Sequence, residues 1–237
     1  IAVPHMHLGG KTGGDPRGGN AVPDARKLYQ RGRWVGEYLS QTSDLLVLGE
    51  CLPGGTTTAL CVLRALGYQA KVSSCLVENP VTKKEQIAAA AVAQVVDAGF
   101  FDPLDITAAV GDPMIPVAAG IAEGYSGKLF LAGGTQMLAA AAVIRALGNT
   151  VPDIVTTSYV YDDPTATFKE TAAAIGADAY YVDPGFGSLG HPGLARYAKG
   201  EIKEGSGAGG AMFLANLLGY TPEQIRDAIL THANAYN

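Results

Sequence analysis

Two segments of this 237-residue chain share a pattern that limits its fold more than any other feature. Each segment starts with a short apolar run, passes through two adjacent glycines and a threonine, and continues into a stretch rich in helix-forming residues. The segments are LVLGECLPGGTTTALCVL, residues 46–63, and KLFLAGGTQMLAAAAVI, residues 128–144. A strand that leads through a tight turn into a helix is the repeating unit of parallel α/β sheets. The pattern therefore predicts such a sheet.

Apolar, strand-like runs alternate with alanine-rich helical stretches along most of the chain. Continuous apolar strands are typical of a sheet that is covered on both faces. We predict a doubly wound, mostly parallel, Rossmann-like α/β fold with helices on both faces. The strands are expected at residues 44–49, 70–75, 128–133, 153–158 and 178–183, and the helices at residues 56–66, 83–98, 114–124, 135–147, 164–175, 207–218 and 222–234.

The start of the chain has a different composition from the rest. Glycine and proline dominate residues 1–25, and neither a helical nor a strand period can be counted there. The chain also begins at Ile1 instead of methionine, so we expect an irregular segment left from a truncated N-terminal region. An amphipathic helix begins at about residue 26, and residues 26–237 are predicted to form one α/β domain.

Charge and composition exclude several classes of protein. The formal net charge of −5 and the lack of a basic block argue against a nucleic-acid surface. No apolar run is long enough to span a bilayer, and no signal peptide is recognisable. Three cysteines without CxxC spacing predict free thiols, with ligand contact by Cys51 as the alternative, and His5 and His7 lack further metal ligands. We therefore expect a cytoplasmic protein that needs no metal ion.

The two glycine turns are the first candidates for ligand binding. Gly54 and Gly55 let the backbone approach a ligand closely, and Thr56 and Thr57 then offer hydroxyls beside the unpaired N–H groups of a helix start. This chemistry suits phosphate, although a plain helix cap is the alternative. No lysine follows the glycines, so the turn is not a Walker loop.

The second turn consists of Gly133, Gly134 and Thr135. Ligands of open α/β sheets collect at the carboxyl ends of the strands. Two such turns in one sheet could therefore hold one ligand across a shared crevice. The alternative is that the paired glycines only permit a tight turn between strand and helix.

Two later glycine-rich loops carry the remaining candidates. In KEGSGAGGAM, residues 203–212, Glu204 precedes Gly205 and an apolar helix, and it acts either as a helix cap or as a general base. In DPGFGSLGHPGL, residues 183–194, no G-x-S-x-G elbow supports a Ser-His-Asp triad. We expect this loop to be a lid in which Ser188 touches ligand. A ligand role for Asp112, in the turn GDPMIP, is left open.

Five of these motifs occur in an order that resembles a known enzyme family. GECLPGGTTTA, NPVTKKEQI, GDPMIPVAAG, LAGGTQMLA and HPGLARYAKGEIKEGSGAGGA together resemble the nicotinate-nucleotide:dimethylbenzimidazole phosphoribosyltransferases, in their archaeal and cyanobacterial branch. The resemblance implies transfer of a phosphoribosyl group from nicotinate mononucleotide to a benzimidazole-type base. The products would be nicotinate and an α-ribazole phosphate for the lower ligand of cobalamin. It also implies a longer protein, a homodimer, and no cofactor.

The resemblance assigns roles to individual residues. The family's catalytic base is a glutamate in a Glu-Gly-(Ser/Thr)-Gly-Ala motif, which matches Glu204. Glu50 matches the glutamate before the family's threonine-rich phosphate loop. Lys84 matches a lysine that opens a following helix, with the adjacent Lys83 as the alternative. On this basis, residues 26–237 form the nucleotide-binding catalytic domain.

The chain also departs from the better-known bacterial members. Leu52 and Gly55 stand where those enzymes carry glycine and asparagine, and GDPM replaces a turn that contains a glutamate. These differences leave the acceptor open between a benzimidazole, adenine or another purine. Two other functions also stay open: a glycosidase that transfers the phosphoribosyl group to water, and a nucleotide-binding regulatory protein without activity.

Overall fold

The computed structural model describes residues 5–52, 54–201 and 206–235. Its centre is a parallel sheet of four strands, in the order β1-β2-β3-β4. Helices cover both faces of the sheet, so the expected α/β class is confirmed, and so are four of the five expected strands. The strands are β1 (Leu45–Gly49), β2 (Lys128–Ala132), β3 (Asp153–Thr157) and β4 (Ala179–Val182).

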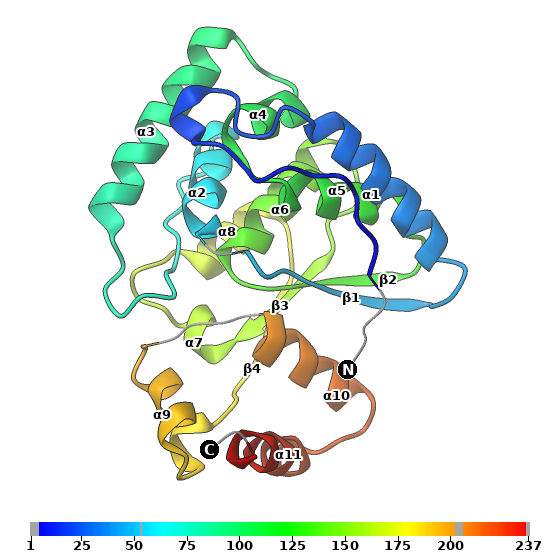
Figure 1. Cartoon of the computed structure of the whole chain (residues 1–237), viewed down its shortest axis with the longest axis vertical. Coiled ribbons are helices and arrows are strands. Elements are labelled where there is room, and N and C mark those ends of the chain that lie inside the picture. Colours follow the sequence, from blue (N-terminus) through cyan, green and yellow to red (C-terminus); the bar gives the residue numbers. More distant parts are fainter. Residues whose placement is uncertain (1–4, 53, 202–205, 236–237) are drawn as a thin grey trace.

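The two faces of the sheet are covered by different parts of the chain (Figure 1). On one face, Leu131 and Ile154 pack into the main core with the helices that connect the strands, including α2 (Gly55–Ala65), α5 (Met114–Gly124) and α6 (Thr135–Ala146). On the other face, Phe130 lies 4.8 Å from Phe213 of α10 (Met212–Leu217), measured between ring centroids. The strands lie in the sheet in the same order as in the sequence, without a reversal. Right-handed crossovers between them therefore all lie on one face of the sheet, and the C-terminal helices cover the other face.

The helices mostly agree with the pattern in the sequence. The remaining elements are η1 (Pro16–Gly18), α1 (Ala25–Leu39), α3 (Val81–Ala98), α4 (Pro103–Val110), α7 (Ser158–Tyr161), α8 (Phe168–Ile175), η2 (Phe186–Ser188), α9 (Pro192–Ala198), η3 (Ser206–Ala211) and α11 (Pro222–Asn234). Three short helices, α4, α7 and α9, were not expected, and α8 begins at residue 168 instead of the predicted 164. The helix expected at 207–218 starts as a π-helix and continues as α10.

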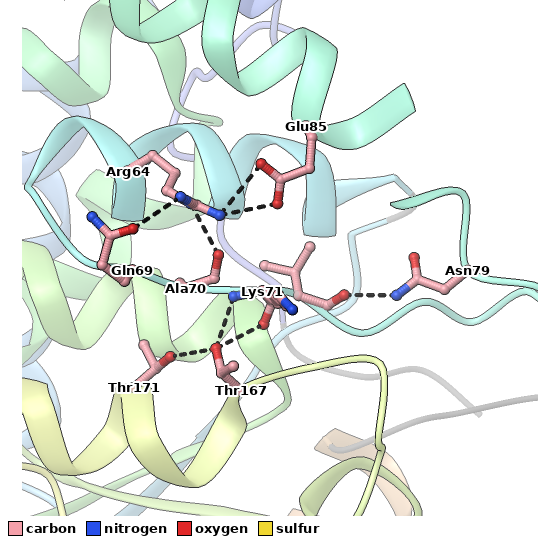
Figure 2. Close-up of polar contacts among 9 residues, drawn as sticks. Arg64, Gln69, Ala70, Lys71, Asn79, Glu85, Thr167 and Thr171 are labelled. Carbon is pink, nitrogen blue, oxygen red and sulfur yellow. Dashed lines mark hydrogen bonds and ion pairs between the residues drawn. The ribbon is translucent and has the colours of Figure 1, made fainter. Parts of the chain in front are cut away.

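The fifth expected strand, at residues 70–75, is wrong. This segment lies outside the sheet, although Ala70 and Val72 are buried as strand residues would be. Its backbone carbonyls accept hydrogen bonds from groups of the surrounding loops and helices instead of from a neighbouring strand, and Figure 2 shows several of these contacts. The bonds, at 2.8–3.0 Å, are Arg64 Nε to Ala70, Thr167 N to Lys71, Asn79 Nδ2 to Val72 and Lys84 Nζ to Ser73. We call residues 70–73 the strap.

The strap shows why an alternating apolar pattern is not sufficient for a strand. Every buried backbone carbonyl needs a hydrogen-bond donor, and a sheet ladder is one of several ways to supply it. In this chain the donors come from residues that lie before and after the strap in sequence, including Arg64 on α2 and Lys84 on α3. The strap is therefore fixed in place without being a strand.

Helices α1 and α5 pack unusually closely through glycines. Gly32 and Gly36 on α1 face Gly120 and Gly124 on α5, each pair spaced by four residues and so lying on one side of its helix. A Cβ atom built on Gly120 would lie 2.0 Å from the carbonyl oxygen of Tyr29, and one on Gly124 would lie 2.1 Å from that of Arg33. The two backbones are thus in direct contact.

Candidate functional site

The carboxyl ends of β1 and β2 bring the two glycine turns together. Gly49, the last residue of β1, is in register with Ala132, the last residue of β2, so the following loops start next to each other. A Cβ atom on Gly133 would lie 3.3 Å from Glu50 Cγ and 3.4 Å from Glu50 Oε1. The structure therefore places Glu50 directly against the Gly133–Gly134 turn.

At least two hydrogen-bond donors hold the Glu50 carboxylate. Its Oε2 atom accepts hydrogen bonds from Gln136 Nε2 at 2.9 Å and from the backbone N–H of Leu52 at 3.1 Å. Gln136 Nε2 also donates to the Leu52 carbonyl at 3.0 Å. Sequence reasoning did not single out Gln136. The signal was its position as the one polar side chain after the threonine of a helix start that otherwise contains Met, Leu and Ala.

The helices that follow the two turns begin without a side-chain cap. Neither Gly54, before α2, nor Gly134, before α6, has a side chain that could accept from the first amides. Six other described α-helices also start without a side-chain cap, whereas Asp102 caps α4, His191 caps α9 and Thr221 caps α11. The first N–H groups of a helix lack partners within the helix and carry partial positive charge, so they favour an anion. Two such helix starts therefore lie at neighbouring strands.

The first turn takes its shape from a glycine in the left-handed region. Gly54 has φ +78°, which other residues rarely adopt, and α2 starts directly after it. Thr56 and Thr57 are half-buried in the first turn of α2. Thr58 faces away from the turn, because its hydroxyl donates to Asp112 Oδ2 at 2.7 Å.

The strap lies beside the second glycine turn. Thr135 is buried, and its hydroxyl lies 3.5 Å from the hydroxyl of Ser73 in the strap. Lys84 is also buried and donates to the Ser73 carbonyl at 2.8 Å and to Asn79 Oδ1 at 2.9 Å. Lys83 is exposed, so Lys84 is the lysine directed toward this region. Sequence reasoning missed Ser73 because it assigned residues 70–75 to a strand.

Among the described residues, Ser188 forms no hydrogen bond with this cluster. Its hydroxyl donates to the carbonyl of Gly185 at 2.8 Å, within its own turn. Glu204 and Gly205 lie outside the described residues. The segment that follows them does reach the sheet, because a Cβ atom on Gly209 would lie 2.7 Å from the carbonyl carbon of Thr156 in β3. Gly210 is similarly close to Ala132 of β2.

Asp112 connects α2 to the start of α5. Its Oδ1 accepts from the N–H of Met114 at 3.0 Å, its Oδ2 accepts from Thr58, and the side chain is buried. Burial raises the pKa of the Asp112 carboxyl, and the hydrogen bonds from Thr58, Met114 and Ile115 offset part of that rise. Asp112 thus fixes the first turn of α2 through Thr58. Among the described residues, Thr58 is the connection between Asp112 and the glycine turns.

The raised pKa of Asp112 predicts a pH-dependent stability. The folded protein keeps the Asp112 proton to a higher pH than the unfolded chain does. The contribution of this proton to the free energy of unfolding is therefore complete below the ordinary carboxyl pKa of 3.8, and it is lost as the pH rises through the pKa of the folded state. We therefore expect Asp112→Asn to gain free energy of unfolding relative to wild type as the pH rises from 4 to 7, by at most about 1.4 kcal/mol per pH unit. Urea unfolding at both pH values measures the difference. The exposed Asp97→Asn is the control, and equal differences at both pH values would contradict the prediction.

A cavity of about 840 Å³ lies between η2, α9, α10 and α11, and no residue of the two glycine turns lines it. The cavity is mostly apolar. It is lined by Phe186, Leu194, Tyr197, Ala211, Met212, Ala215, Tyr220, Gln224, Ile225, Ala228, Ile229 and His232. No described cluster of three or more His, Cys, Asp or Glu side chains could hold a metal ion, and no described helix is both long and apolar enough to cross a membrane.

Comparison with curated proteins identifies similar archaeal chains. The UPF0284 protein of Methanothermobacter thermautotrophicus is 44% identical over 240 residues, which cover 96% of this chain and 66% of that protein. Those of Thermococcus onnurineus (44% over 229 residues) and Methanosarcina mazei (42% over 236 residues) each match over 68% of their own length. The chain thus spans about two thirds of these relatives. No family model matches the chain.

Two solved structures from Thermus thermophilus share the fold. One is described as CobT, with a TM-score of 0.56, 21% identity, and coverage of 72% of this chain and 53% of that one. The other is described as nicotinate-nucleotide-dimethylbenzimidazole phosphoribosyltransferase, with a TM-score of 0.53, 21% identity, and coverage of 80% and 60%. At 21% identity, the two solved structures show only that the fold is shared. The archaeal relatives, at 42–44% identity, show that the sequence is shared as well. The chain therefore belongs to the UPF0284 protein family and has the fold of these two structures.

Proposed function

We propose that this chain carries the nucleotide-binding and catalytic region of a phosphoribosyltransferase. The reaction transfers the 5-phosphoribosyl group of nicotinate mononucleotide to a benzimidazole-type base and gives nicotinate and an α-ribazole phosphate, a precursor of the lower ligand of cobalamin. The shared fold and the order of the five motifs support this proposal. The archaeal relatives have names that state no activity, so the reaction is a proposal for the family as well.

One observation carries the proposal: two helix starts without side-chain caps lie at neighbouring strands, with a carboxylate between them. The N–H groups of Gly55, Thr57 and Met137 already donate to nearby carbonyls. Within the described part of the chain, this leaves those of Thr56 on α2 and of Thr135 and Gln136 on α6 for an anion such as a 5′-phosphate. Glu50, at the end of β1, offers acceptor atoms to hydroxyls such as those of a ribose. A sugar phosphate needs both kinds of group within a few ångströms of each other.

The remaining chemistry needs a single base. Nicotinate leaves from a cationic pyridinium, so its departure requires no general acid. The attacking imidazole nitrogen of the acceptor becomes positively charged unless the partner N–H of its ring loses a proton. We assign this proton to Glu204, whose following segment packs against β2 and β3. Attack opposite the leaving ring inverts the configuration from β to α. Ligand contacts by Lys84, Ser188 and Gly205, and a homodimeric assembly, stay predictions.

A product assay tests the proposed function. The full-length protein that contains this sequence is incubated with nicotinate mononucleotide and dimethylbenzimidazole, adenine or no base, and the products are identified by mass spectrometry. An α-ribotide of either base is the expected result and names the acceptor. Release of nicotinate and ribose 5-phosphate at the same rate without base would indicate a glycosidase, and no consumption of nucleotide in any mixture would contradict an enzymatic role.

A further inference from the structure

Gln136 connects the two glycine turns. It is the second residue of α6, and its side chain crosses from the end of β2 to the loop that follows β1. Its amide nitrogen donates to Glu50 Oε2 at 2.9 Å and to the carbonyl of Leu52 at 3.0 Å. The bond to Glu50 joins residues 86 positions apart in the sequence.

The two contacts match the hydrogen-bonding capacity of an amide. A glutamine side chain has two N–H donors on its nitrogen, and here the nitrogen faces two acceptors. A glutamate at position 136 would place an oxygen against the Glu50 carboxylate and the Leu52 carbonyl, where all three groups accept. The Leu52 N–H supplies a second donor to Glu50 Oε2. Gln136 and the loop that Gln136 holds therefore both contribute to the orientation of this carboxylate.

The glycines of the two turns make room for this arrangement. A Cβ atom on Gly55 would lie 2.6 Å from Gln136 Nε2 and 2.8 Å from Leu52 Cδ2. A Cβ atom on Gly133 would lie 2.7 Å from Met137 Cγ and 3.3 Å from Glu50 Cγ. The paired glycines thus admit the Gln136–Glu50 contact as well as any ligand.

We propose that Gln136 is the positioning residue for Glu50. It holds the carboxylate in one orientation between the starts of α2 and α6, so that a sugar phosphate bound to both helix starts presents its hydroxyls to an acceptor already in place. This role rests on the proposed function, because it assumes a phosphoribosyl ligand at the two turns. It assigns to Gln136 an effect on nucleotide affinity that passes through Glu50.

A double-mutant cycle in nucleotide binding tests this role. Gln136→Met keeps the length of the side chain and removes both donors, and Gln86→Met, at an exposed position of α3, is the matched control. The dissociation constant for nicotinate mononucleotide is measured by calorimetry on the full-length protein in wild-type and Glu50→Gln backgrounds. We expect Gln136→Met to weaken binding about ten-fold in the wild-type background, as loss of a hydrogen bond to a charged group would, and less than about two-fold in the Glu50→Gln background.

The outcomes separate the role of Gln136 from the function itself. An equal loss of affinity in both backgrounds would show that Gln136 acts on the general structure of the turn and would overturn the proposal. So would wild-type affinity in Gln136→Met. Wild-type protein that neither binds nor consumes nicotinate mononucleotide would reject the proposed function, and this role with it. The KM of Gln136→Met is expected to rise in parallel with the dissociation constant, with a smaller change in kcat.

Discussion

The Gly120→Ala variant is expected to lose at least about 3 kcal/mol of its free energy of unfolding, at the upper end of the cost of overpacking a core. The new Cβ atom would lie 2.0 Å from the carbonyl oxygen of Tyr29 and 2.8 Å from the backbone nitrogen of Arg33. Both atoms belong to the backbone of α1, so no rotation of a side chain relieves the contact. The two helices must move apart, and Gly124, which has the same kind of contact, loses its packing too.

The sign of this effect is opposite to that of helix propensity. Alanine in the interior of a helix is normally better than glycine by about 1 kcal/mol. Urea unfolding followed by circular dichroism measures the change, with Gly124→Ala as a second test. Gly18→Ala is the control, because a Cβ atom there would have no neighbour within 4 Å. Stability of Gly120→Ala equal to or above wild type would show that the close contact of α1 and α5 is wrong.

The Glu204→Gln variant is expected to lose turnover by a factor of about 10² to 10⁴, the usual contribution of a general base. Glutamine has nearly the same shape, but it cannot accept the proton that the acceptor base must lose. Binding of nicotinate mononucleotide is expected to stay within about three-fold of wild type, because the proposed phosphate and ribose contacts come from the turns after β1 and β2. Single-turnover kinetics and calorimetry measure the two quantities on the full-length protein.

A neighbouring glutamate provides the control for this variant. Glu201 lies three positions before Glu204 and forms an ion pair with Arg196 at the surface of α9. Glu201→Gln removes a carboxylate from the same segment and is expected to keep turnover within about two-fold, because surface ion pairs contribute little. Full activity in Glu204→Gln would reject Glu204 as the base, even if the transferase reaction itself is observed.

The elements of this fold could be predicted where a contiguous pattern specifies them. The apolar runs of β1 and β2 are each followed by glycines and a helix-forming stretch, and this order indicates a parallel strand, a tight turn and a helix. The strap has a similar pattern, with buried Ala70 and Val72, yet it is not a strand. Periodicity reports which side chains are buried, but it does not report which donor each carbonyl finds.

The candidate site was located by the same kind of local pattern. Gly54 and Gly55, and then Gly133 and Gly134, stand where the strands end, and parallel strands bring their carboxyl ends to one edge. Glu50 could be placed beside the first turn because it follows β1 directly. Its contact with Gly133 follows from the pairing of β1 with β2, which the sequence alone did not specify.

The sequence by itself determined the α/β class, most of the strands and helices, and the two glycine turns. Each of these depends on backbone preferences and burial within a short window of residues. Only the tertiary structure decided that Gln136 holds Glu50, that Lys84 fixes the strap beside Thr135, and that Asp112 holds Thr58. These partners are up to 86 residues apart in sequence. They meet because the strands pair in one register and the helices pack on the sheet in one arrangement. No contiguous pattern of residues encodes these long-range contacts.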